Sequence, residues 1–178
     1  MQDLDKLRFP IGKFVRPEAY SEEQMNEWIE TITMLPNELY DLMTDIPEED
    51  DSILDQPYRP GGWSARQVIH HLADSHMNSF IRFKQALTQD NPTIMAYDEN
   101  AWAQTPEITH SPVDFSLMLL SGVHLRWSVL MEYMQEADWK RTFYHPEHQT
   151  SFELRYALAM YAWHSEHHLE HIKMALRA

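Results

Sequence analysis

The sequence predicts an all-α protein, a four-helix bundle with a long crossover between its second and third helices. Three observations lead to this class. The chain has 178 residues, of which 43% are hydrophobic and 12% aromatic, enough to build one compact core. Its four glycines leave room for long regular elements. Four segments begin with helix-start signals, and little of the chain remains for a sheet. We expect a single domain over residues 1–178.

Capping boxes predict the first two helices. Ser21 and Gln24, in SEEQ, precede MNEWIETITMLPNELYDLM, where Pro36 should kink or interrupt the helix. Ser64 and Gln67, in SARQ, follow a PGGW turn and precede VIHHLADSHMNSFIRFKQAL.

The last two helices begin after proline- and threonine-containing segments. Pro112 should be the first residue of the third helix, after Ser111 as its cap, and that helix should run to about Tyr133. The segment TSFE at 150–153 is predicted to open the fourth helix, which can run to the C-terminus. The preceding RTFYHPEHQ gives a weak signal for a short hairpin around Pro146.

The link between the second and third helices is unusually long. It extends from about Thr88 to His110, more than an ordinary helix-to-helix connection needs. A crossover in a four-helix bundle explains this length, and such bundles build metal sites between facing helices.

Composition excludes several classes of function. The net charge of −14 argues against binding to nucleic acid or to an anionic membrane. The absence of cysteine removes disulfides, thiolate ligands and a cysteine nucleophile. The N-terminal residues do not resemble a signal peptide, and no apolar run is long enough to span a membrane. We therefore expect a cytoplasmic protein.

Four histidines crowd the last helix, in YAWHSEHHLEHI. On a helical wheel His164 and His168 lie roughly 40–80° from the centre of the apolar side, and His167 and His171 roughly 100–140° from it. The first pair therefore points into the bundle, with the H-x-x-x-H spacing that lets two imidazoles bind one ion. The alternative is a solvated stripe of polar side chains, and a metal site needs a third ligand from elsewhere.

Other helices offer candidates for that third ligand. In the second helix His76 lies near the centre of the apolar face and His71 on its flank, and the wheel alone does not choose between them. His124 in the third helix is an inward-facing residue, either ligand or core. His70 should lie on the surface. No structural or functional role is expected for three loop histidines, which are His110, His145 and His148.

Motifs that are missing narrow the chemistry. H-E-x-x-H does not occur, and the only Glu-x-x-His lies in the crossover, so a zincin protease and a ferritin-like di-iron centre are both disfavoured. An all-histidine mononuclear site remains.

The chain resembles the DinB/YfiT-like metalloenzymes, in RFPIGKF, in YRPGGWSARQVIHHLADSHMNSFIRFK, in FYHP and in YAWHSEHH. The resemblance covers nearly the whole chain and implies a homodimeric four-helix bundle with one divalent ion per chain, zinc or nickel. In that family the second-helix ligand follows a tryptophan by eight residues, which from Trp63 gives His71. The implied ligands are His71, His164 and His168.

The resemblance implies a metal-dependent hydrolase acting on a small molecule. One alternative is a thiol S-transferase of the bacillithiol type, which would use a low-molecular-weight thiol. Another is a non-catalytic metal-binding bundle, and a third is a pH switch at a dimer interface built from His167 and His171. No general acid or base is identifiable. Asp74, His76 and His124 are candidates for partners that orient a ligand, although a structural role is expected first for each. Arg82 and Arg126 could bind an anionic substrate or pair with carboxylates.

Overall fold

Four long helices form the protein, and the computed structural model describes them within residues 4–47 and 51–177. They are α2 (Glu22–Thr44), α3 (Ala65–Thr88), α6 (Val113–Glu132) and α8 (Leu154–Leu176). The shorter elements are α1 (Leu4–Arg8), η1 (Ser52–Asp55), α4 (Glu99–Trp102), α5 (Pro106–His110), α7 (Glu136–Trp139), β1 (Thr142–His145) and β2 (Thr150–Glu153). The predicted bundle is confirmed.

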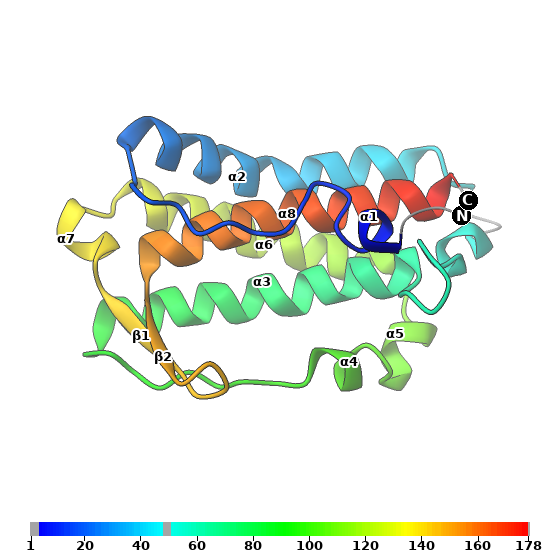
Figure 1. The fold of residues 1–178 in the computed structure, drawn as a ribbon. Helices are drawn as coiled ribbons and strands as arrows, with labels where there is room; N and C mark the ends of the chain where they lie inside the picture. Colours follow the sequence, from blue (N-terminus) through cyan, green and yellow to red (C-terminus); the bar gives the residue numbers. More distant parts are fainter. Residues whose placement is uncertain (1–3, 48–50, 178) are drawn as a thin grey trace.

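The order of the helices around the bundle differs from a simple up-and-down arrangement. Helices α2 and α3 each pack against both α6 and α8, so α2 and α3 occupy opposite corners. In Figure 1, α2 and α8 run in one direction and α3 and α6 in the other. The connection that contains α4 and α5 therefore returns along the whole length of α3 before α6 begins. This is the long crossover that the sequence predicts.

The helix starts follow their local chemistry. Ser21 caps α2 by accepting a hydrogen bond from the Gln24 amide at 3.2 Å. At α3 the capping box is complete, because Ser64 Oγ accepts from the Gln67 amide and Gln67 Oε1 accepts from the Ser64 amide. Helix α6 begins one residue later than predicted, with Pro112 as the cap and not as the first helical residue.

The segment 150–153 does not open the last helix, and that prediction was wrong. It forms β2, which pairs antiparallel with β1, so the weakly predicted hairpin is present. Helix α8 starts directly after it, with Glu153 still in an extended conformation. The hairpin also holds the crossover, since the Ile94 amide donates to the Tyr144 carbonyl and the Tyr144 amide donates to the Pro92 carbonyl.

Pro36 does not interrupt α2, contrary to one of the two predicted outcomes. The helix continues from Glu22 to Thr44 with Pro36 buried inside it. Proline has no backbone N–H, so the Ile32 carbonyl four residues earlier lacks its usual helical partner. That carbonyl instead lies 2.6 Å from Nδ1 of His124 on α6.

The core consists of two hydrophobic clusters. One contains Phe83, Trp127 and Leu158, and the other contains Leu72 and Leu120. Histidines on α3, α6 and α8 lie between the two clusters along the helices. Of these, His76 is 0% and His124 is 1% exposed. A polar layer thus crosses the middle of the bundle.

Candidate metal centre

The structure brings together the three histidines that the sequence and the resemblance selected. His71 comes from α3, and His164 and His168 lie one turn apart on α8. One potential ligand nitrogen from each of the three lies within 4.8 Å of the others. The Nε2 atoms of His71 and His164 are 3.2 Å apart. Two nitrogens bound to one zinc ion in a tetrahedral site lie about 3.3 Å apart, so the donor set fits a divalent metal.

The PGGW turn places Trp63 against these rings. Gly61 has a φ of +68°, and a side chain at Gly62 would meet Arg59, so both positions of the turn favour glycine. The indole lies 4.8 Å from the ring of His71 and stacks on His168 at 6.4 Å between ring centroids. Its packing restricts the rotation of two of the three imidazoles.

Burial keeps the three imidazoles neutral. Desolvation lowers the pKa of His71 to about 4. It holds the pKa values of His164 and His168 well below their usual range, and the neighbouring imidazoles lower them further. Neutral rings offer the lone pairs that a metal ion needs.

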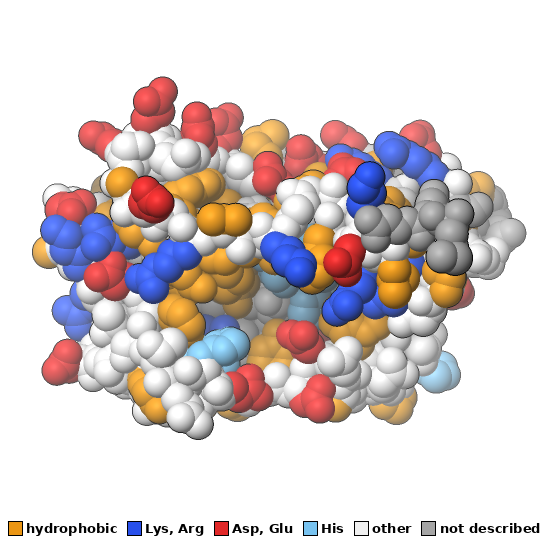
Figure 2. All heavy atoms as spheres, in the orientation of Figure 1, with side chains coloured by type: hydrophobic (Ala, Val, Ile, Leu, Met, Phe, Trp, Pro, Cys, Tyr) orange, Lys and Arg blue, Asp and Glu red, His pale blue; other side chains and the backbone are white. Residues whose placement is uncertain are grey.

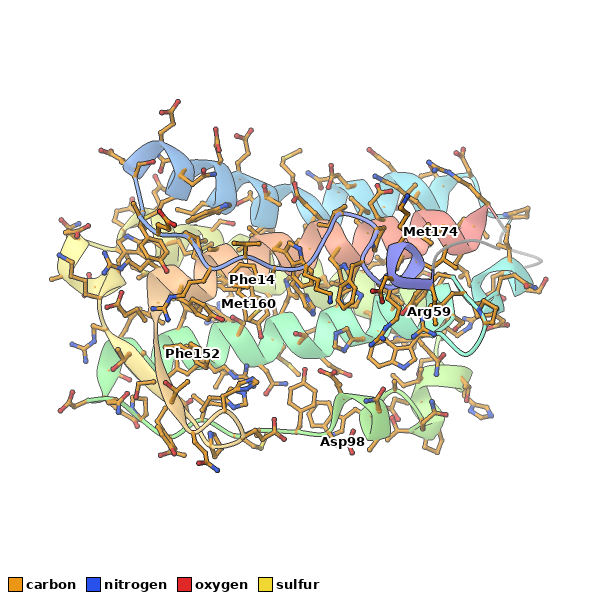
Figure 3. All side chains as sticks on the ribbon, viewed as in Figure 1. Phe14, Arg59, Asp98, Phe152, Met160 and Met174 are labelled. Carbon is orange, nitrogen blue, oxygen red and sulfur yellow. The ribbon has the colours of Figure 1, made fainter. Side chains whose placement is uncertain are left out.

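A cavity of about 410 Å³ opens onto this site. In Figure 2, histidine atoms are visible inside a hollow in the face that is shown, with Lys and Arg side chains along its upper rim. Charged residues from three segments line the cavity: Arg8, Arg59 and Glu99. Figure 3 shows Arg59 beside α1, near the end of the bundle that this short helix covers. Burial raises the pKa of the Glu99 carboxyl, helped by the charges of Glu147 and Asp98.

The second histidine pair of α8 is buried, although the wheel placed it away from the core. His167 is 7% and His171 is 2% exposed. Segments outside the four-helix core cover them: His167 stacks on Phe9 and His171 stacks on Tyr58, the latter at 3.8 Å between ring centroids. A solvated stripe is therefore wrong for this pair, and so is an exposed position at a subunit interface. With His168 they form a second group of three whose nitrogens lie within 4.8 Å of one another.

His76, the competitor of His71, lies in the polar layer. Its Nε2 is 3.1 Å from Nδ1 of His164, and its Nδ1 is 2.9 Å from Nε2 of His124. His76 and His124 thus lie behind the candidate ligand His164. The group whose nitrogens lie within 4.8 Å of one another contains His71 and not His76.

His70 is not a surface residue, which corrects the sequence-based expectation. It is 5% exposed, and its Nδ1 lies 2.7 Å from Ser116 Oγ on α6. Arg66, on the same face, is buried too and forms ion pairs with Asp51 and Asp55. This face of α3 is covered by α5, η1 and part of α6, which a wheel for one helix cannot include.

The remaining candidate residues lie outside the group formed by His71, His164 and His168. Asp74 has a pKa raised to about 6 by burial and by Glu107. Arg82 donates to the Tyr161 hydroxyl and to a backbone carbonyl, and Arg126 lies over the Phe80 ring. The three loop histidines also lie elsewhere: His110 at the end of α5, and His145 and His148 at the hairpin.

The sequence alone did not point to the three charged residues that line the cavity. Arg8 and Arg59 come from segments without a strong periodic signal, and Glu99 comes from the crossover. Arg8 and Arg59 do lie in RFPIGKF and YRPGGW, two stretches that carry the family resemblance, but neither stretch points to a role for its arginine.

Comparisons with known proteins place the chain in a family. Residues 31–172 match the model of the DinB superfamily. A protein of Bacillus cereus named "Putative metal-dependent hydrolase" is 47% identical over 169 residues, which cover 95% of each chain. A similarly named protein of Bacillus mycoides is 48% identical over the same length, again 95% of each chain.

A solved structure has the same fold. YfiT from Bacillus subtilis, described as "a probable metal-dependent hydrolase with an unusual four-helix bundle topology", matches with a TM-score of 0.89 and 43% identity. The match covers 97% of both chains. No helix in the part of the chain that the structure describes is long and apolar enough to cross a membrane. With its four-helix fold and its histidine cluster, the chain belongs to the DinB superfamily.

Proposed function

We propose that this protein is a cytoplasmic metal-dependent hydrolase that acts on a small molecule. One divalent ion per chain, zinc or nickel, would be held by His71, His164 and His168. The observation that carries this proposal is the convergence of three neutral imidazoles on one point beside an open cavity. An all-nitrogen donor set suits either metal. The names of the relatives support the same class of enzyme.

The cavity supplies the remaining requirements of a hydrolase. An ion held by these three imidazoles would retain room for water or substrate, and would supply Lewis acidity that lowers the pKa of a water and polarises the substrate. The volume of about 410 Å³ is that of a site for a small molecule. Arg8 and Arg59 provide positive charge for an anionic group of the substrate, and Glu99 is a carboxyl with a raised pKa at the same cavity. We assign Glu99 as the candidate general base.

Metal content and activity test the proposal together. Elemental mass spectrometry of tag-free protein should find about one metal ion per chain, and none in H71A or H164A. H148A is the matched control, because His148 is an exposed histidine at the hairpin. A panel of esters and amides should then be hydrolysed by the wild type, with E99Q slower at unchanged metal content. A wild type that binds no metal after reconstitution would refute the proposal.

A second candidate function is a thiol S-transferase. The observation that favours it is the pair Arg8 and Arg59 in a chain whose net charge is −14, since a low-molecular-weight thiol of the bacillithiol type carries carboxylates. Turnover that requires such a thiol, with no hydrolysis in its absence, would select this function. A stable metal site with neither activity would leave the non-catalytic bundle.

We also propose a homodimer formed through α6. This helix exposes apolar side chains along one side, at spacings of three, four and seven residues. Met118 is 64%, Leu125 is 66% and Tyr133 is 74% exposed, and Phe115 and Val129 continue the row. A row of exposed apolar side chains of this kind is typical of a protein interface, and a two-fold axis would pair it with itself.

A further inference from the structure

The polar layer of the bundle contains a continuous chain of hydrogen bonds that starts at a proline. Pro36 leaves the Ile32 carbonyl without a helical donor, and His124 Nδ1 lies 2.6 Å from that oxygen. A carbonyl oxygen can only accept a hydrogen bond. His124 must therefore carry its proton on Nδ1.

This one constraint propagates through the next two rings. A neutral imidazole has one N–H and one acceptor nitrogen, so His124 Nε2 accepts from His76 Nδ1 at 2.9 Å. His76 Nε2 then accepts from His164 Nδ1 at 3.1 Å. The contacts described for His76, His124 and His164 include no carboxylate that could balance a positive charge on one of these rings. An isolated buried charge is costly. All three rings are therefore neutral and protonated on Nδ1.

The end of this chain is the candidate metal ligand. With its proton on Nδ1, His164 presents the lone pair of Nε2, which lies 3.2 Å from Nε2 of His71. The opposite tautomer would place a proton at the metal position and prevent binding. We propose that His76 and His124 are positioning residues that hold His164 in its metal-binding tautomer, with the carbonyl freed by Pro36 as the anchor. The inference rests on the proposed metal site, but the tautomers exist without metal.

Packing fixes the geometry of the relay. The rings of His76 and His124 stack with an interplanar angle of 9°. Tyr161 and Trp127 pack against His76 edge-on, at 5.2 and 6.1 Å between ring centroids. These contacts keep each ring in the plane that its two hydrogen bonds need. Ordered partners behind a metal ligand commonly contribute about 10–100-fold to metal affinity.

The first test is nuclear magnetic resonance of metal-free wild-type protein with ¹⁵N-labelled histidine. Long-range ¹H–¹⁵N correlations distinguish the two neutral tautomers of each ring. We expect the Nδ1–H form for His76, His124 and His164. A His164 ring protonated on Nε2 overturns the inference. This measurement needs neither a variant nor a metal.

The second test is the zinc affinity of two variants, measured by competition with a chelator. H76L breaks the relay, and we expect its dissociation constant to rise about 10–100-fold. H76Q should restore much of the affinity, because the glutamine amide offers a donor and an acceptor about as far apart as the two ring nitrogens. H70L is the matched control, since His70 is also buried on the same helix but bonds to Ser116. Equal zinc affinity in H76L and the wild type overturns the inference about the relay. A wild type that binds no zinc but shows the expected tautomers refutes only the proposed metal site.

Discussion

Removing His164 should destabilise the metal-free protein more than removing His71. Both substitutions delete an imidazole at the cavity, and both remove the contact between the two Nε2 atoms. Only H164A also removes the donor to His76 Nε2, a nitrogen of a side chain that is 0% exposed. The two variants thus differ by one buried hydrogen-bond partner.

The size of this difference follows from the cost of an unsatisfied buried polar group. That cost is about 1–3 kcal/mol, and a water entering from the cavity would move it toward the lower end. In a chain of this length 1 kcal/mol shifts the melting temperature by about 2–4 °C. We expect H164A to melt about 2–12 °C below H71A in the presence of a chelator, in the lower part of this range if a water enters.

Differential scanning calorimetry with EDTA at pH 7.5 measures this difference directly. H148A should melt like the wild type, because His148 is exposed and lies outside the bundle core. Equal melting temperatures for H164A and H71A, or a lower one for H71A, would refute the argument that His164 Nδ1 supports the polar layer.

Four further outcomes are expected. Folding lowers the pKa of His71 from its ordinary value of 6.5 to about 4, so the unfolded chain binds more protons between these pH values. The free energy of unfolding of the metal-free protein should therefore fall on acidification, by about 2 kcal/mol at pH 5 for this group alone. Equal free energies of unfolding from urea titrations at pH 8 and pH 5 would contradict this. Zinc at 100 times its dissociation constant should stabilise the wild type by about 2.7 kcal/mol and leave H71A unchanged, which thermal scans with and without zinc can show. S64A should lose about 1 kcal/mol in denaturant unfolding through loss of the α3 cap, and an unchanged midpoint would argue against that role. L125E should convert the proposed dimer into a monomer in analytical ultracentrifugation, whereas S21A, at the start of α2 and outside that row, should not.

The helices were predictable because their start signals are local. Ser21 and Ser64 bond to amides three residues away, so a short stretch of sequence contains the whole interaction. The start of α8 was misplaced because Thr150 can cap a helix or lie in a strand. The choice depends on pairing with His145 across the hairpin, for which the local sequence gives only a weak signal.

The candidate site was predictable only in part for a similar reason. The wheel directed His164 and His168 into the bundle, and the structure places His164 against His71 and His76 of α3, since the direction of a side chain depends on one helix and its apolar face. It failed for His167 and His171 because Phe9 and Tyr58 cover them, and these two residues lie more than a hundred residues earlier in the chain. The choice of His71 over His76 required the family resemblance. The sequence offers His76 and His124 as partners that orient a ligand, but not the anchor of the relay, because that anchor is a carbonyl in α2.

The diagonal placement of α2 and α3 has a consequence for how the protein is made. In an up-and-down bundle the first two helices can pack as a hairpin while the rest of the chain is still being synthesised. Here each of them packs mainly against α6 and α8, so long-range contacts must wait for later parts of the chain. His71 emerges from the ribosome more than ninety residues before His168. A nascent chain that lacks α8 cannot assemble the three-histidine group, so the proposed metal ion can bind there only after α8 has been synthesised.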